Sequence, residues 1–302
     1  METKQIIFIL FIIIIIPNFN QSFGQSTTGN DDIEQTFRNH MRETPFYKRN
    51  QIEVDEEDVL QMVDNLPAFG VFRDSYFVTG IPLNKPINVN TADAMFQISI
   101  RHRITKSRLP YNTFLFITYT QKAFWNIYAK SSPFHDINYN PAIGLGKYII
   151  HNNKFKGTAF LQIEHESNGR DSLDSRSWNM ASISVKYFFN PQIVLGLKTW
   201  IPIVDGKNNK DLIDHRGWAL VSLNYITKNE KWWFSAEFNS KKGSFASANT
   251  TLTAGIKVSD KSNQYLYARF HSGTGDSLLD YKQYNINIRV GFCIKPNYLS
   301  IF

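Results

Sequence analysis

The chain contains little cysteine and little charge, and each shortage excludes a class of protein. Its 302 residues include one cysteine, Cys293, which excludes an intrachain disulfide framework and a cysteine-rich zinc site. Charged residues make up only 20% of the chain, but hydrophobic residues make up 42%, so a disordered chain is excluded as well. The net charge of +7 is modest and its basic residues are scattered, so we expect no nucleic-acid partner.

Long apolar runs are equally scarce. One run, residues 6–17, follows Lys4, and no second run is long enough to indicate a helical membrane protein. A membrane anchor is the alternative for this segment, but the run is short for a hydrocarbon core of about 30 Å. Small and polar residues follow it at 21–24. We therefore expect residues 1–24 to be a secretory signal peptide, with the mature chain beginning near Gln25.

Residues 25–73 form a separate, acidic segment. Carboxylates gather at 31–32 and 55–58, and the apolar residues of 59–63 have helical spacing. We expect an N-terminal arm that is partly helical or flexible. It could plug another part of the protein or act as a solvated linker, and the linker is the simpler interpretation.

Aromatic residues and period-two alternation are what the sequence has in quantity. Aromatic residues make up 15% of the chain. From residue 74 onward apolar and polar residues alternate, as at Ile286, Ile288, Val290 and Phe292, which is typical of strands with one apolar face. About twelve such segments occur, and several approach the roughly 9–11 residues that a tilted strand needs to cross a bilayer.

Two architectures fit this alternation: a soluble sandwich or barrel with apolar faces inward, and a membrane barrel with apolar faces toward lipid. The signal peptide and the terminal aromatic Phe302, which closes an amphipathic last segment, favour the membrane barrel. Tryptophans expected near strand ends favour it too, as an interfacial girdle: Trp125, Trp200, Trp218, Trp232 and Trp233. We therefore predict an all-β fold, with residues 74–302 forming a transmembrane antiparallel β-barrel of about 12 strands and a short N-terminal extension.

Three polar residues are predicted on the face that should meet lipid. His165 and Ser167 share the parity of Leu161 and Ile163, and a hairpin turning around residue 172 brings Asn179 opposite His165. Their side chains suit a relay of nucleophile, base and orienting group. Polar groups facing hydrocarbon are costly, and mutual hydrogen bonding lowers that cost. The alternative is a set of incidental polar residues at the membrane rim.

Several motifs in register resemble one family. Residues 165–170 (HESNGR) and 175–179 (SRSWN) resemble the signature of bacterial outer membrane phospholipase A. Residues 119–121 with Trp125, 131–134 leading to 138–141, and 275–281 agree with it, so the resemblance spans about residues 74–302. It implies a twelve-stranded outer-membrane barrel with an outward Ser-His-Asn triad, active as a calcium-bound homodimer on phospholipid.

The resemblance also implies roles for individual residues. Ser167 is implied as nucleophile, His165 as base, Asn179 as orienting group and the Gly169 amide as an oxyanion donor. Ca²⁺ is implied to take the backbone carbonyls of Arg170 and Ser175 and the Ser131 hydroxyl of the facing subunit, with Asp211 at a further calcium position; Tyr119 and Gln121 support the site. Oxygen ligands suit this hard cation. Ser172 stands where the family pattern has a carboxylate, which puts a secondary calcium site in doubt.

These observations lead to one function and one alternative. We expect a calcium-dependent phospholipase in the outer membrane of a Gram-negative-type bacterium, which hydrolyses acyl esters of glycerophospholipids with A1 or A2 activity and is activated by dimerisation. The alternative is a non-enzymatic outer-membrane barrel, either a porin or a structural protein. That alternative needs neither the outward triad nor the loop that carries Ser131.

Overall fold

The computed structural model describes residue 35 and residues 56–205, 208–241, 244–259 and 262–296. The expected signal peptide, most of the acidic arm before Glu56 and the terminal Phe302 lie outside the described residues. Two α-helices, two 3₁₀-helices and thirteen strands make up the described part.

Antiparallel strands account for most of the described chain. Their bounds are β1 (Phe69–Val71), β2 (Ser75–Pro82), β3 (Asp93–Arg103), β4 (Thr113–Trp125), β5 (Phe134–His151), β6 (Lys154–Ser167), β7 (Ser177–Phe188), β8 (Ile193–Asp205), β9 (Ala219–Ile226), β10 (Trp232–Lys241), β11 (Ser244–Lys257), β12 (Gln264–Gly273) and β13 (Asn285–Ile294). The helices are α3 (Glu56–Asp64), α4 (Leu212–Arg216), η1 (Pro110–Asn112) and η2 (Ser172–Asp174).

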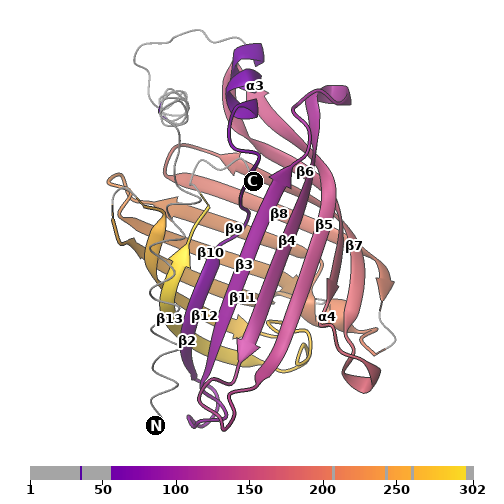
Figure 1. Ribbon diagram of the computed structural model, residues 1–302, viewed down its shortest axis with the longest axis vertical. Helices are drawn as coiled ribbons and strands as arrows, with labels where there is room; N and C mark the ends of the chain where they lie inside the picture. Colours follow the sequence, from indigo (N-terminus) through magenta and orange to yellow (C-terminus); the bar gives the residue numbers. More distant parts are fainter. Residues whose placement is uncertain (1–34, 36–55, 206–207, 242–243, 260–261, 297–302) are drawn as a thin grey trace.

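Twelve of these strands close on themselves. Each strand from β2 to β13 pairs with its neighbours in sequence, and β13 returns to pair with β2. β1 is an additional strand that pairs with β3 next to the end of β2. Closure leaves no open edge among the twelve strands, which is the condition for a sheet to cross a bilayer. The predicted barrel of about 12 strands is confirmed (Figure 1).

The two faces of each strand have opposite chemistry. On β13 the outward residues Val290 and Phe292 are 56% and 53% exposed, whereas Arg289 beside them is 3% exposed. The same inversion recurs around the barrel, with exposed Ile98, Ile143, Leu161, Ile183, Leu223, Leu252 and Leu266. The apolar faces therefore point toward lipid and the polar faces toward the lumen, as the alternation predicts.

The expected girdle of tryptophans is wrong at two positions. Trp200 and Trp233 are buried at 8% and 7% exposure, and both belong to apolar clusters with other buried side chains. Trp200 has the parity of Lys198, which binds a luminal carboxylate, so its ring faces inward. Trp218 and Trp232 are exposed. The girdle was predicted because these tryptophans lie near strand ends. Whether a side chain points to lipid or to the lumen depends instead on its parity along the strand.

Ion pairs occupy much of the barrel interior. Asp276 accepts a hydrogen bond from Arg269 at 2.9 Å and from Lys122 at 3.2 Å. Glu164, which is 2% exposed, lies 2.5 Å from the ammonium of Lys198. Buried charges persist where they are paired and hydrogen-bonded, so this network makes the polar face of the strands compatible with a narrow barrel.

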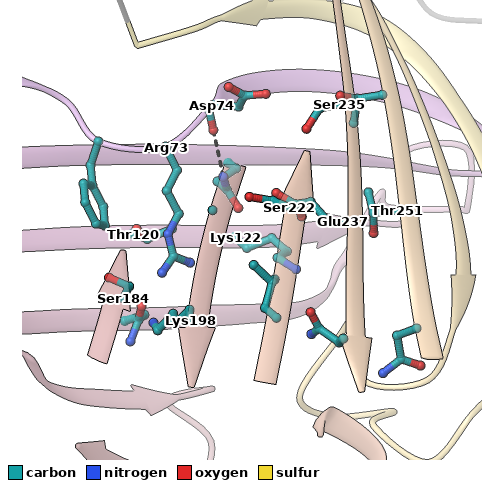
Figure 2. A pocket seen from close by; sticks show the side chains of 18 of the residues that line it. Arg73, Asp74, Thr120, Lys122, Ser184, Lys198, Ser222, Ser235, Glu237 and Thr251 are labelled. Carbon is teal, nitrogen blue, oxygen red and sulfur yellow. Dashed lines mark hydrogen bonds between the residues drawn. The ribbon is translucent and has the colours of Figure 1, made fainter. Parts of the chain in front are cut away.

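A polar cavity of about 450 Å³ remains inside the barrel. Figure 2 shows charged side chains on its walls, among them Arg73, Lys198 and Glu237. Lys198 of the ion-pair network is one of its lining residues, so the cavity lies on the luminal side of the strands.

The two ends of the barrel differ in their connections. At the end that carries α4 the strands are joined by the longer segments 126–133, 168–176, 206–218 and 274–284. At the opposite end three hairpins turn within residues 152–153, 189–192 and 227–231, the β3–β4 connection at 104–112 is longer and contains η1, and α3 lies there (Figure 1). In the described part of the chain, neither helix combines enough length and apolar character to span a bilayer.

Helix α3 docks on the short-turn end of the barrel. It begins with three carboxylates at 56–58, which suit the positive end of a helix dipole. Val59 and Val63 are fully buried in a cluster of luminal aromatic residues that includes Phe155 and Phe188. The described part of the acidic arm therefore covers the barrel mouth, and the solvated-linker interpretation is wrong for this helix.

A second set of contacts fixes the end of α3. Arg103 donates to the backbone carbonyls of Val63 and Asp64 at 3.0 and 2.6 Å. The Asp64 carboxylate in turn accepts from the backbone amide and the hydroxyl of Ser107, both at 3.0 Å. Arg103 is 5% exposed, so the arm is joined to the barrel by a buried, multiply bonded guanidinium.

We expect Val63→Asp to lower the temperature at which the folded barrel is lost, because it puts an unpaired carboxylate among aromatic rings at a cost of several kcal/mol by order of magnitude. Val89→Asp is the matched control, since Val89 is 57% exposed. The measurement is the loss of the faster-migrating folded band on dodecyl sulfate gels as samples are heated. Equal transition temperatures for the two variants would contradict the docking of α3.

Candidate active site

The β6–β7 hairpin brings together the polar residues that parity predicts. Its register pairs His165 with Asn179 and Ser167 with Ser177. Leu161 and Ile163 on the same face of β6 are 56% and 53% exposed, whereas Glu164 on the other face is 2% exposed. His165, Ser167 and Asn179 therefore lie on the outer wall, where β6 ends and β7 begins.

One hydrogen bond joins two of these three side chains. His165 Nδ1 lies 2.9 Å from Asn179 Oδ1, and this geometry gives Nδ1 the proton and leaves Nε2 as an acceptor. Among the described residues no hydrogen bond engages the Ser167 hydroxyl.

Polar residues continue across the neighbouring strands. The cross-strand register places Gln121 beside Tyr139 and Tyr139 beside Ser167. The Tyr119 hydroxyl donates to Gln121 Oε1 at 3.0 Å. From the luminal side, Asn140 donates to the His165 carbonyl at 3.0 Å, which fixes the strand beneath these residues. A polar patch therefore interrupts the apolar outer wall over β4 to β7, and it includes Tyr119 and Gln121, the predicted supporting residues.

The loop between β6 and β7 is organised around Asn168, which is 4% exposed. Its side-chain oxygen accepts from the Arg176 amide at 2.9 Å, and its side-chain amide donates to the Asp174 carbonyl at 2.9 Å. Sequence reasoning assigned Asn168 no role. Its role could have been predicted from the residue type, because asparagine side chains commonly form hydrogen bonds to the backbone of the turn that follows them.

Gly169 is in the left-handed region, with φ of 64°. A Cβ at this position would lie 3.0 Å from the Tyr139 ring, so glycine suits both the conformation and the contact. In the described part of the chain no acceptor binds the Gly169 amide. The amide is therefore available to an external oxygen.

Ser131 lies on a neighbouring loop, between β4 and β5, and it is exposed. It adopts a positive φ of 64°. The following residue, Ser132, fixes the turn: its carbonyl accepts from Trp125 Nε1 at 2.7 Å and its hydroxyl donates to the Ile127 carbonyl at 2.9 Å. The Ser131 hydroxyl is therefore presented outward by a closed turn.

The predicted calcium ligands consist of oxygen donors. Arg170 and Ser175 offer backbone carbonyls at the two ends of the β6–β7 loop, and the Ser175 carbonyl already accepts from Arg176 Nη1 at 2.9 Å. A carbonyl has a second lone pair, so this bond leaves room for a cation. Within the described residues, no three side chains of His, Cys, Asp or Glu cluster to hold a metal. The donor set fits a hard cation bound mainly by carbonyls and hydroxyls.

Asp211, the residue predicted at a further calcium position, is engaged by other groups. Its carboxylate accepts from the Tyr281 hydroxyl and lies 2.7 Å from the Lys282 ammonium. Hydrogen bonds from Lys282 and Tyr281 lower the pKa of Asp211 to about 2, so the carboxylate stays ionised at any physiological pH. A cation binding there competes with the lysine.

The luminal side of this hairpin supports the outer wall. Glu166 accepts from Trp178 Nε1 at 2.9 Å and forms an ion pair with Arg216, which lies in α4. Glu166, Trp178 and Arg216 line the luminal cavity, whereas His165, Ser167 and Asn179 do not. These three residues therefore lie on the outer side of the barrel wall, away from the cavity.

Fold and surface together define a transmembrane β-barrel with an imidazole, a hydroxyl and an amide on its lipid-facing wall. The family model for phospholipase A1 matches residues 79–294. The chain therefore belongs to the phospholipase A1 family and is an ester hydrolase of the outer membrane. This membership excludes the alternative that the protein is a non-enzymatic barrel.

Sequence relatives agree with this assignment. The chain is 27% identical over 210 residues to phospholipase A1 of Escherichia coli K12, covering 68% of this chain and 70% of the relative. It is 28% identical over 215 residues to phospholipase A1 of Proteus vulgaris, covering 70% and 71% of the two chains. These matches confirm the resemblance drawn from the motifs.

Solved structures show the same fold. Outer membrane phospholipase A from Escherichia coli is similar with a TM-score of 0.66 at 22% identity, covering 75% of this chain and 98% of that chain. The outer membrane phospholipase dimer of Salmonella typhi, solved with bound calcium, gives a TM-score of 0.66 at 22% identity, covering 88% and 98% of the chains.

We expect Asn168→Ala to reduce phospholipase turnover by about 10-fold or more, because it removes the side chain that shapes the loop after Ser167. The matched control is Asn190→Ala. Asn190 caps the β7–β8 turn at the other end of the barrel through bonds of 2.8 and 2.9 Å to the amides of Gln192 and Ile193. Turnover is measured in detergent micelles, with heat-modifiable migration as the folding check. Equal activity of the two folded variants would refute the role of Asn168.

Proposed function

We propose that the protein hydrolyses acyl ester bonds of glycerophospholipids, with A1 or A2 activity, through Ser167, His165 and Asn179. The observation that carries this proposal is the 2.9 Å contact between His165 Nδ1 and Asn179 Oδ1, with Ser167 two residues away on the same lipid-facing wall. A nucleophile, a base and a group that orients the base are the parts that serine-type ester hydrolysis needs.

Each residue has a defined task in this reaction. His165 Nε2 takes the proton of the Ser167 hydroxyl as the oxygen attacks the ester carbonyl, and then gives it to the departing lysophospholipid oxygen. Asn179 Oδ1 accepts a hydrogen bond from the Nδ1–H group and so holds the tautomer in which Nε2 is a base. The Gly169 amide donates to the developing oxyanion. Water, activated by the same imidazole, then hydrolyses the acyl-serine.

A neutral orienting residue suits a membrane surface. An aspartate at position 179 would place a full negative charge against lipid, at a high desolvation cost. Asparagine provides the same acceptor geometry without that charge. The imidazole and the amide satisfy each other, which also lowers the cost of the polar patch in the resting enzyme.

We further propose that Ca²⁺ and dimerisation activate the enzyme; the Salmonella typhi relative, a dimer with bound calcium, supports this. The carbonyls of Arg170 and Ser175, with the exposed Ser131 hydroxyl of a second copy, would hold the ion. When bound, such an ion would supply positive charge that favours the oxyanion of the ester hydrolysis. An isolated barrel lacks the third protein ligand, so it would stay nearly inactive in its own membrane.

The Asp211 position is the weaker of the two calcium sites in this proposal, because an ion there must displace Lys282 from a carboxylate 2.7 Å away. Residues 1–24 are proposed to export the chain before it inserts into the outer membrane of a Gram-negative-type bacterium.

We expect Ser167→Ala to lower ester hydrolysis by about 10⁴-fold or more and His165→Ala to be similarly severe, because each removes a group that reacts. Asn179→Ala should lose less, because it affects only the orientation of the base. Fatty-acid release from phosphatidylcholine micelles, with calcium and with chelator, is the measurement. Serine-directed sulfonyl fluorides should label the wild type but not Ser167→Ala.

Ser177→Ala is the matched control for these variants. Ser177 lies directly across from Ser167 in the hairpin, but it has no assigned task. It should retain near wild-type turnover and labelling. Retained activity in folded Ser167→Ala would overturn the assignment of the nucleophile.

We expect turnover to rise together with calcium and with the dimer fraction, and Ser131→Ala to raise the calcium concentration needed for half-maximal activity. Loss of one preorganised oxyanion donor typically costs about 10²–10³ in kcat, which sets the scale of the difference between monomer and dimer. Cross-linking across a calcium titration, with turnover in parallel, measures both. Ser262→Ala, in a turn at the far end, is the control. Full activity of chelator-treated monomer would refute this activation while leaving the triad assignment intact.

A further inference from the structure

Three segments that are distant in sequence meet beside the β6–β7 loop. They are the first residues of β5, the β12–β13 loop at 274–284, and Arg170 of the β6–β7 loop. Asp136, in β5, lies at their centre and is 1% exposed. The function proposed above gives Asp136 no task.

The two oxygens of the Asp136 carboxylate are in different situations. Oδ2 accepts from Asn138 Nδ2 at 2.6 Å, from the Ser277 hydroxyl at 2.7 Å and from the Leu279 amide at 3.0 Å. Oδ1 is buried and has no hydrogen-bond partner among the described residues. Arg170 Nε lies 3.9 Å from it. A buried carboxylate oxygen without a hydrogen bond is costly, so this guanidinium is the charge that compensates it.

Arg170 is held from more than one direction. Its guanidinium also donates to the His135 carbonyl and lies 3.7 Å from the Asp174 carboxylate. His135 is itself paired with Asp280 of the β12–β13 loop. The arginine side chain thus connects the β6–β7 loop to the start of β5, and His135 and Asp136 in turn contact the β12–β13 loop.

Two backbone groups that the proposed chemistry needs from this loop, the Gly169 amide and the Arg170 carbonyl, lie on either side of the Gly169–Arg170 peptide bond. The Gly169–Arg170 peptide follows the Gly169 amide directly, and the Arg170 carbonyl is the assigned calcium ligand. Gly169 has a positive φ of 64° and no side chain to fix its position. An anchor on the next residue is therefore well placed to set the direction of the amide and of the carbonyl together.

We propose that Asp136 is a positioning residue, which holds the Arg170 side chain and through it orients the Gly169–Arg170 backbone for ester hydrolysis. This inference rests on the function proposed above. The competing explanation is structural: through Ser277 and Leu279, Asp136 would only fix the β12–β13 loop.

The test uses Asp136→Asn, Arg170→Gln, the double variant and wild type, refolded in detergent. Asp136→Asn keeps the shape but removes the charge facing Arg170. Arg170→Gln removes the guanidinium that faces Asp136 and leaves the bonds of Asp136 to Ser277 and Leu279 intact. The Arg170 side chain is 37% exposed, so we expect this substitution to affect folding little. Asp93→Asn breaks another ion pair of the barrel, the 2.7 Å contact with Arg289, and serves as the matched control.

We expect each of the two single variants to lower kcat by about 10–10²-fold with little change in KM, because a small displacement of a catalytic group has this scale of effect. The calcium concentration for half-maximal activity should rise as well. The double variant should be no worse than the more impaired single variant, since both substitutions break one connection. Asp93→Asn should keep wild-type kcat and calcium dependence.

The outcomes separate the explanations. If Asp136→Asn is impaired but folded Arg170→Gln has wild-type kcat and calcium dependence, the role is structural and the proposal is overturned. Additive losses in the double variant, or an equal loss in Asp93→Asn, overturn it too. If Asp136→Asn fails to fold, Arg170→Gln decides alone. Ser167→Ala runs in parallel: if it is active, the proposed function falls and takes this inference with it; if it is inactive while both single variants are unchanged, only this inference falls.

Discussion

The structure depends on one constraint, that every backbone amide and carbonyl inside a bilayer must find a partner within the protein. Twelve strands satisfy it by closing, with β13 returning to β2. In a closed barrel each strand has one face toward lipid and one toward a narrow lumen, because its side chains alternate between the two. The charges of the lumen follow from this, since polar side chains on that face can be kept only in pairs such as Glu164 with Lys198.

The same constraint makes the outer wall an unusual place for polar residues. His165, Ser167 and Asn179 stand where isoleucine and leucine stand on the rest of β6 and β7. They are tolerated because they lie at the rim, where the strands end, and because imidazole and amide bond to each other. Their neighbours Tyr139 and Gln121 extend the patch. The polar patch is therefore compatible with a wall that is otherwise suited to lipid.

The period of two along the strands predicted the barrel and the outward position of His165, Ser167 and Asn179. It did not predict the packing inside the barrel or the contacts between its loops. Parity alone placed Asn179 across from His165, because in a hairpin the register follows from the position of the turn. The inward direction of Trp200 was missed, although Lys198 has the same parity. The docking of α3 was not predictable, since its burial comes from aromatic residues contributed by several distant strands. The contact between Asp136 and Arg170 joins segments that are distant in sequence, and no local pattern encodes it.

The position of the polar patch along the strands has a geometric consequence. Ser167 is the last residue of β6, and the exposed apolar residues Leu161 and Ile163 precede it on the same face, which suits them to contact acyl chains. Ester bonds of a phospholipid lie between headgroup and hydrocarbon, at the height where such a strand leaves the membrane. The length of β6 therefore determines the depth of Ser167 relative to the bilayer. Within this proposed chemistry, bond selection comes from height in the bilayer and needs no deep pocket for the headgroup.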